Sequence, residues 1–161
     1  MSAPHARYHD YVAPHPQIVR CPIQASMGVF GRKWALLVLR DVALKSNVRF
    51  SDILRANPGM TPRILVLRLK ELEAEGLVTR VIKHDKREVY YELAPAGRDA
   101  IPILTALIYF GTKRRPHQVF RDGRSRTMAE MFPGSQRELL QGMADWAAKG
   151  VRKPPRSARE G

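Results

Sequence analysis

TPRILVLRLKELEAEG occupies residues 61–76 and predicts a short helix with one buried face and one basic face. Thr61 suits the N-cap position because its hydroxyl can accept a hydrogen bond from an early helix amide. Pro62 fits the first helical position, where its missing N–H is not needed. The buried face is formed by Leu65, Leu69 and Leu72, which recur at helical spacing. Gly76 ends the helix, since glycine readily takes the left-handed conformation found there.

The other side of this helix is basic, and the residues before it predict a second helix. Arg63, Arg68 and Lys70 leave the buried face, and we expect them to point outward. Residues 51–57 form the preceding helix, which the Pro-Gly pair at 58–59 breaks. A short helix, a break and a capped helix together have the spacing of a helix-turn-helix.

A β-hairpin is predicted directly after this unit. Residues 78–83 and 88–93 alternate between apolar and polar side chains, and polar residues 84–87 join them. Three cations lie at or near its tip: Lys83, Lys86 and Arg87. Such a tip can be a simple solvated turn. Its position after a helix-turn-helix favours contact with phosphate or the minor groove of a duplex.

Three further helices complete the predicted domain. Residues 33–42 are apolar on two sides, so we expect them to form the central core helix. Residues 22–31 carry an apolar stripe of Ile23, Met27 and Phe30. A last helix runs from about residue 94 to Gly111, with Pro102 bending or distorting it. Its apolar face is large for a small domain, which suggests a partner surface.

The composition points to a polyanionic partner. The chain has 161 residues, 44% of them hydrophobic, which suffices for one domain with a packed core. The formal net charge is +13, and residues 112–161 alone hold 12 basic and five acidic side chains. Such an excess of cations favours nucleic acid. Membrane binding would require a basic helix with a strongly apolar face at one end of the chain.

Other function classes find little support in the sequence. No apolar run approaches the roughly 20 residues that a membrane helix needs, and the N-terminus lacks a signal-peptide core. A single cysteine suits a reducing interior, so we expect a cytoplasmic protein with no membrane partner. We see no Gly-rich phosphate loop and no Ser/His/Asp arrangement, and therefore expect neither enzymatic activity nor a cofactor.

The two ends of the chain are predicted to lie outside the domain. Residues 1–20 form a flexible, proline-broken arm, residues 21–113 the DNA-binding domain, and residues 114–161 a basic extension. Within that extension we expect a flexible connector at 117–133, an amphipathic helix at about 135–149 and a disordered tail. The arm holds His5, His9 and His15 ahead of Cys21, but their spacing matches no standard zinc arrangement, so we expect no metal site.

Cys21 lies at the predicted start of the helix that begins with Pro22. Helix amides at that position favour a thiolate. Cys21 is therefore a candidate sensor of oxidants or electrophiles. The competing interpretation is a small, half-buried capping residue.

Several motifs in order form a recognisable set: Cys21-Pro22-Ile23, Gly31-Arg32-Lys33-Trp34, Arg49-Phe50-Ser51-Asp52-Ile53, residues 58–65, residues 68–78, and residues 90–98. Together they resemble the HxlR family of bacterial and archaeal transcription regulators, relatives of the MarR group. The resemblance covers about residues 20–113. It implies a mainly α fold with a small β-hairpin wing (α+β), a winged helix-turn-helix that forms a homodimer through its N- and C-terminal helices.

The resemblance also implies a function. Such dimers bind two-fold operators in double-stranded DNA, with half-sites roughly 34–36 Å apart. Some family members sense aldehydes, quinones or oxidants through a cysteine near the first helix, and Cys21 occupies the matching position. A small-molecule effector is compatible with the resemblance, although the sequence identifies none.

Two features depart from the family pattern. Val66 and Leu67 stand where relatives carry polar residues on the recognition face, and they can contact thymine methyls but not hydrogen-bonding base edges. Base readout would then depend on Arg63 and Arg68. The second departure is the basic extension beyond residue 115.

We therefore expect a sequence-specific, homodimeric transcriptional regulator. The expected DNA-contacting residues are Arg49, Ser51, Thr61, Arg63, Val66, Leu67, Arg68, Lys70, Lys83, Lys86 and Arg87. The alternatives are a winged-helix module that binds protein and a non-specific, chromatin-like DNA-binding protein.

Overall fold

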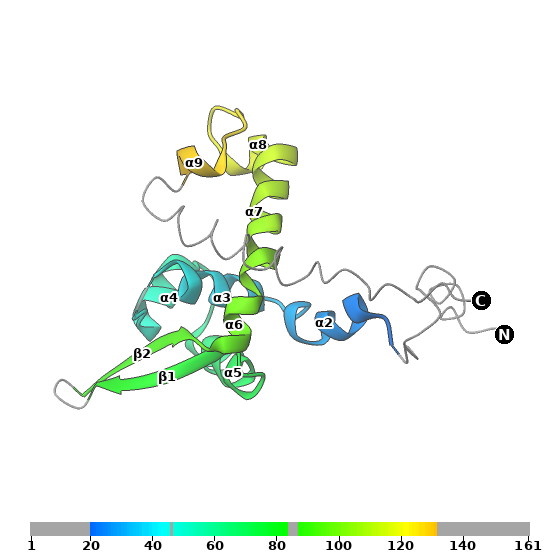
Figure 1. The fold of residues 1–161 in the computed structure, drawn as a ribbon. Coiled ribbons are helices and arrows are strands. Elements are labelled where there is room, and N and C mark those ends of the chain that lie inside the picture. Colours follow the sequence, from blue (N-terminus) through cyan, green and yellow to red (C-terminus); the bar gives the residue numbers. More distant parts are fainter. Residues whose placement is uncertain (1–19, 46, 84–86, 132–161) are drawn as a thin grey trace, which may run out of the picture.

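A computed structural model describes residues 20–131, apart from residue 46 and residues 84–86 (Figure 1). It is mainly helical, with one two-stranded antiparallel sheet in the described part. Three sequence predictions lie outside the described residues: the flexible arm up to residue 19, the amphipathic helix at about 135–149 and the disordered tail. Lys86 in the wing tip lies outside them too.

The central core helix is α3 (Ala35–Leu44), as the two-sided apolar pattern predicted. Val38 and Leu39 are fully buried among side chains of α4 (Phe50–Ala56), α5 (Pro62–Ala74) and the wing. The helix begins at Ala35 rather than at residue 33. Trp34 has φ +78°, a left-handed conformation that is incompatible with a helical turn and rare for a bulky side chain.

The helix-turn-helix forms where it was predicted. Gly59 takes φ +91° in the turn between α4 and α5, and Thr61 Oγ1 accepts a hydrogen bond from Ile64 N at 3.3 Å. At the other end of α5, Gly76 has φ +68° and Leu77 N donates to Leu72 O at 2.8 Å. This bond satisfies a carbonyl in the last turn of α5, as is usual where a helix ends at a left-handed glycine.

The wing consists of β1 (Val78–Lys83) and β2 (Glu88–Leu93), the two strands that the alternation predicted. They pair antiparallel, with Val78 opposite Leu93 and Lys83 opposite Glu88. Tyr91 N also donates to Val48 O at 2.9 Å, so Val48, two residues before α4, forms an antiparallel bridge with β2. The wing is thereby attached to the helix-turn-helix twice: β1 follows α5 in the chain, and β2 bridges to Val48 ahead of α4.

The predicted helix from residue 94 to Gly111 is in fact two helices. Residues Pro95–Asp99 form α6 and Ile101–Arg114 form α7, with the break at Ala100. Pro102 has no N–H to donate to the carbonyl of Arg98, so the chain restarts a helix there instead of continuing one. The expected end near Gly111 was also wrong, because α7 continues to Arg114.

The segment predicted as a flexible connector, residues 117–133, contains regular secondary structure in its described part. Short helices α8 (Pro116–Val119) and α9 (Met128–Met131) flank a turn in which Arg126 pairs with Asp122 at 2.7 Å. The Arg126 hydrogen bonds lower the pKa of Asp122 to about 2. Thr127 and Glu130 bond each other's backbone amides, which is a capping box at the start of α9.

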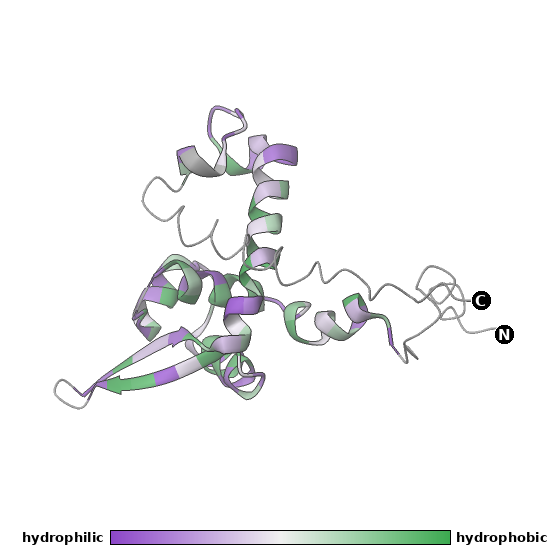
Figure 2. Cartoon of the chain, viewed as in Figure 1, coloured by the Kyte–Doolittle hydropathy of each residue, from purple (hydrophilic) through white to green (hydrophobic). Residues whose placement is uncertain are grey.

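Two helices project from the core (Figure 1). The first, α2 (Pro22–Phe30), extends sideways and buries none of its residues; the second, α7, rises from the body and carries α8 and α9 at its far end. Both helices carry hydrophobic residues, coloured green in Figure 2, among more polar ones. Among the described residues, no helix is long and apolar enough to cross a bilayer.

Candidate nucleic-acid interface

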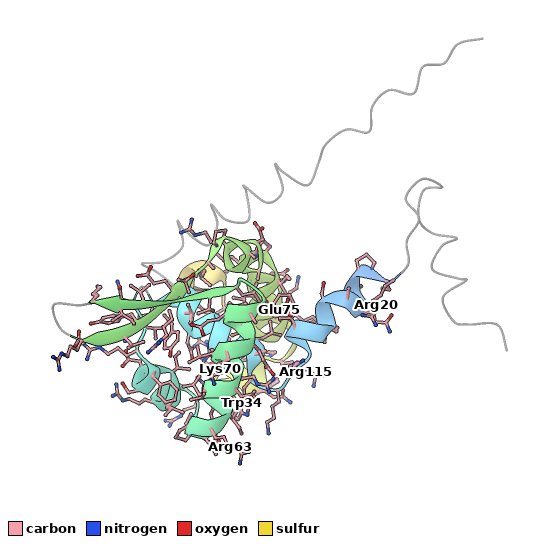
Figure 3. The ribbon with its side chains drawn as sticks, turned by 90° about the horizontal axis from the view of Figure 1, so that it is seen from below. Arg20, Trp34, Arg63, Lys70, Glu75 and Arg115 are labelled. Atoms are coloured by element: carbon pink, nitrogen blue, oxygen red, sulfur yellow. The ribbon has the colours of Figure 1, made fainter. Side chains whose placement is uncertain are left out.

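The outward face of α5 is the centre of the candidate site. Because Leu65, Leu69 and Leu72 are buried, the residues on the opposite side of the helix meet solvent. Those residues are Arg63, Val66, Leu67 and Lys70. Seen from below, α5 lies at the surface, with Arg63 near its N-terminal end and Lys70 further along (Figure 3). Neither cation forms an ion pair within the part of the chain that the structure describes.

Val66 and Leu67 stand on this face as the sequence predicted, with 43% and 48% of their surface exposed. Their position gives the middle of the face an apolar character between two cations. Side chains of this kind can contact the C5-methyl of thymine in the major groove.

Arg68 departs from its predicted orientation. Only 13% of its side chain is exposed, and Arg68 Nη1 lies 2.9 Å from Glu71 Oε2. Its Nε is buried with no hydrogen-bond partner in the described structure. The prediction that Arg68 points outward was therefore wrong: its position turns the side chain toward Glu71, which also pairs with Arg32 of the α2–α3 junction.

Thr61 and Ser51 lie at the N-termini of α5 and α4. The Thr61 hydroxyl caps α5, so a contact with DNA would have to use its remaining donor. Ser51 is exposed in the first turn of α4. The adjoining Asp52 carboxylate accepts from Lys45 Nζ at 3.0 Å and from Arg49 N at 3.3 Å, and these bonds lower its pKa. Helix N-termini of this kind present amides that suit phosphate.

Arg49 connects α4 to the wing. Its Nη2 lies 2.5 Å from Glu88 Oε1 and donates to the Tyr90 hydroxyl at 3.1 Å. The Tyr90 bond, followed by the charge of Glu88, raises the pKa of Arg49. Lys83 Nζ lies 4.7 Å from the centre of the same aromatic ring. Two predicted contact residues, Arg49 and Lys83, are thus brought together on Tyr90. Arg87, at the start of the segment that leads into β2, is exposed and has φ +50°.

Asn57 orients the turn between α4 and α5, and the sequence analysis missed it. It is 4% exposed and donates to Asp41 Oδ2 at 2.5 Å and to Ile53 O at 2.8 Å. Arg40 Nη2 donates to Asp41 Oδ1 at 2.6 Å and to Asn57 Oδ1 at 3.2 Å. These bonds attach the turn to the core helix α3. An asparagine directly before Pro-Gly was the available signal, since such residues often hydrogen-bond the backbone of a turn.

Two further residues are relevant to the site: Arg55, which the sequence analysis did not name, and Cys21, which it did. Arg55 in the last turn of α4 has 77% of its side chain exposed and was not predicted. Cys21 is the half-buried N-cap of α2, the helix that projects away from the wing in Figure 1. Its side chain makes no capping hydrogen bond.

Comparison with known proteins agrees with this geometry. A family model described as HxlR-like helix-turn-helix matches residues 29–119. An uncharacterised HTH-type transcriptional regulator of Synechocystis is 37% identical over 57% of this chain and 68% of its own. One of Methanothermobacter thermautotrophicus is 38% identical over 61% and 75%. The solved structure titled redox regulator HypR, in its oxidised form, is 33% identical, with a TM-score of 0.54 over 58% of this chain and 96% of that one.

Proposed function

The chain belongs to the HxlR-like helix-turn-helix family of transcriptional regulators, and from this premise we propose that it binds a specific two-fold operator as a homodimer. The observation that carries the proposal is the outward face of α5, on which Arg63 and Lys70 flank exposed Val66 and Leu67. In a winged helix-turn-helix, this helix enters the major groove. A DNA-binding regulator acts where the chromosome is, so we place the protein in the cytoplasm.

The expected contacts divide by chemistry. Arg63 is the candidate for base readout, since a guanidinium can bond both O6 and N7 of guanine. Val66 and Leu67 would pack on thymine methyls. The phosphate contacts would come from Ser51, Thr61, Lys70, Lys83, Lys86 and Arg87. Arg49 anchors the wing through Glu88 and Tyr90 while adding positive charge to the same face. Arg68 would act indirectly, by pairing with Glu71 of the same helix, whose carboxylate also pairs with Arg32 of the α2–α3 junction.

Dimerisation is supported by the two projecting helices. On α2, Ile23 is 70% exposed and Met27 52% exposed. On α7, Ile103 and Phe110 are exposed as well. Apolar side chains gathered in this way on projecting elements mark an interface rather than a solvated surface. Pairing through α2 and α7 would place two copies of α5 on successive turns of one duplex.

Cys21 is proposed as the sensor of a redox or electrophile signal. HypR, one of the similar structures, is titled a redox regulator. Cys21 lies at the end of a helix that belongs to the proposed dimer interface, so a covalent adduct there would disturb the pairing of two copies. Mass spectrometry after mild quinone treatment should find one adduct, on Cys21. DNA affinity should change in the wild type and stay constant in Cys21→Ser; an unmodified thiol would remove this part of the proposal.

The function itself is tested by fluorescence anisotropy at two salt concentrations. An operator is first selected from a random duplex library with the purified protein, and its affinity is compared with that of a scrambled duplex. We expect the operator to bind at least about 1,000-fold more tightly and both affinities to fall steeply with salt, because phosphate neutralisation releases counterions.

Two other functions are tested by the same measurements. Val66 and Leu67, exposed on α5, favour a module that binds protein, which predicts weak DNA binding even in dilute buffer. The net charge of +13 favours a chromatin-like protein, which predicts equal affinity for operator and scrambled DNA. Either result would replace the proposal of a specific regulator.

A further inference from the structure

A hollow of about 550 Å³ lies between α3 and α7. Its walls are Leu36 and Leu44 of α3 and Leu104 and Ile108 of α7, and Val119 of α8 and Met131 of α9 close it at the far end of α7. The lining is almost entirely apolar. A volume of this size lies within the roughly 300–1,000 Å³ range of small-molecule sites. We call it the α3–α7 pocket.

Arg40 is the one charged residue among those that line the α3–α7 pocket. Its Nε and Nη2 donate to Asp41, and Nη2 also donates to Asn57. Its Nη1 donates to no group in the described part of the chain. An apolar pocket with one guanidinium at its wall has the chemistry to hold a molecule with an apolar body and an anionic end.

We propose that the α3–α7 pocket binds a small amphipathic organic anion, a carboxylate with an aliphatic body, whose charged end pairs with Arg40. The apolar body lies between α3 and α7, where it covers the partly exposed side chains of Leu36, Leu44 and Ile108. The overall charge of +13 raises the local concentration of anions around the protein and so favours the charged form of such a ligand over its neutral analogue.

Binding at this pocket reaches the helix-turn-helix through Arg40. The guanidinium that receives the carboxylate is the same one that holds Asp41 and Asn57, and Asn57 orients the turn between α4 and α5. A ligand that draws Arg40 into the pocket weakens its bond to Asn57, which is already long at 3.2 Å. The ligand therefore lowers DNA affinity; this step, unlike ligand binding, rests on the proposed function.

The ligand site is tested on the DNA-free, full-length protein by isothermal titration calorimetry with octanoate and 1-octanol. We expect octanoate to bind about tenfold more tightly than octanol, a difference that one charge-assisted pair can supply. Arg40→Met should remove this preference and leave octanol affinity unchanged. No octanoate binding to the wild type, or an undiminished preference in Arg40→Met, would overturn the proposal.

Gly111 offers a matched pair of pocket variants. It lines the pocket from α7, and a Cβ at this position meets no atom within 4 Å. Gly111→Leu should fill the pocket and reduce octanoate affinity at least tenfold, whereas Gly111→Ala should keep it. Val119→Trp fills the same pocket from the exposed side of α8 and should reproduce the loss. If Gly111→Leu instead dissociates the dimer and leaves octanoate binding unchanged, a second copy occupies the groove and the proposal fails.

The coupling is tested by repeating the operator titration with octanoate, using acetate at the same concentration as the ionic control. Octanoate should weaken operator binding several-fold in the wild type and in Gly111→Ala, but not in Gly111→Leu. Octanoate binding with an unchanged operator affinity would remove the coupling and keep the site. Absence of operator binding in every sample would instead count against the proposed function.

Discussion

Arg63 and Arg68 carry the same charge on the same helix but lie in different environments. Arg63 is exposed at the N-terminal end of α5, whereas Arg68 is 13% exposed and paired with Glu71. We predict that Arg63→Ala weakens operator binding by about 1–3 kcal/mol and relaxes preference at one base pair, because a bidentate contact to guanine is lost. Competition anisotropy against single-base operator variants measures both effects.

Arg68→Ala is the matched comparison for that experiment. It should lower the unfolding free energy and weaken binding to all duplexes alike, since the mostly buried Arg68 side chain holds Glu71, which joins α5 to Arg32, and does not read a base. A change of base preference in Arg68→Ala, with none in Arg63→Ala, would reverse the assignment of the two residues.

Asn57 carries the second prediction at the scale of single residues. Asn57→Ala removes the Asn57 amide that donates to Asp41 Oδ2 and to the Ile53 carbonyl, so we expect a loss of about 1–3 kcal/mol in the free energy of unfolding. Urea denaturation followed by circular dichroism measures it. Gln118→Ala, at an exposed position of α8, should stay within about 0.5 kcal/mol of the wild type. Equal midpoints for the two variants would mean that Asn57 does not anchor the turn.

The sequence could predict which face of α5 is buried but not the tilt of Arg68 or the bonds of Asn57. Leucine spacing defines an average buried face, and a residue at its edge turns inward or outward according to its neighbours. Arg68 turns inward because Glu71 stands one turn further along α5. Asn57 depends on Arg40 and Asp41, which are far away in sequence.

Two glycines at helical positions give a matched prediction at the scale of elements. A Cβ on Gly97 of α6 would lie 2.0 Å from the carbonyl oxygen of Leu77, so α6 packs on the wing only through a glycine. A Cβ on Gly111 of α7 would meet nothing within 4 Å. We predict that Gly97→Ala lowers the unfolding free energy by about 2 kcal/mol or more, whereas Gly111→Ala raises it by about 0.5–1 kcal/mol.

Thermal and urea denaturation of the two alanine variants test this contrast. The wing should loosen in Gly97→Ala, which hydrogen exchange of the β1 amides would report. Similar stability of both variants would show that α6 can shift away from Leu77 at little cost.

Elements with strong local signals were the ones that the sequence predicted well. α5 has a capping threonine, an N-terminal proline and a terminal glycine, and both wing strands alternate cleanly. The start of α3 was missed because Trp34 adopts a left-handed conformation that residue type does not suggest. The turn at 122–126 was read as flexible because its composition is basic, although Arg126 pairs with Asp122 and lies 4.4 Å from the Phe120 ring.

At the scale of the whole molecule, α2 is the helix whose stability is least explained by packing within a single copy of the chain. It has nine residues, none of them buried, and it projects from the core (Figure 1). Isolated helices shorter than about 12–15 residues are marginal in water, so α2 needs a surface to pack against. Ile23 and Met27, exposed on one side of it, are the residues that such a surface would cover. A second copy of the chain meets this requirement.

The double variant Ile23→Glu, Met27→Glu tests the proposed dimer. It places two like charges on the apolar side of α2, and we expect sedimentation equilibrium to show monomers at concentrations where the wild type is dimeric. Ala25→Glu is the control, because at 3.6 residues per turn Ala25 faces away from Ile23 and Met27. The control should remain dimeric.

The same variants separate dimerisation from DNA contact. Two linked half-sites bind far more tightly than one, so the double variant should lose at least about 100-fold in affinity for the two-fold operator. Its affinity for an isolated half-site should equal that of the wild type, since α5 and the wing are unchanged. A double variant that stays dimeric, or an Ala25→Glu variant that dissociates equally, would place the interface elsewhere. Loss of half-site binding as well would mean that α2 supports α5 directly, through the Arg32–Glu71 pair that connects the α2–α3 junction to the recognition helix.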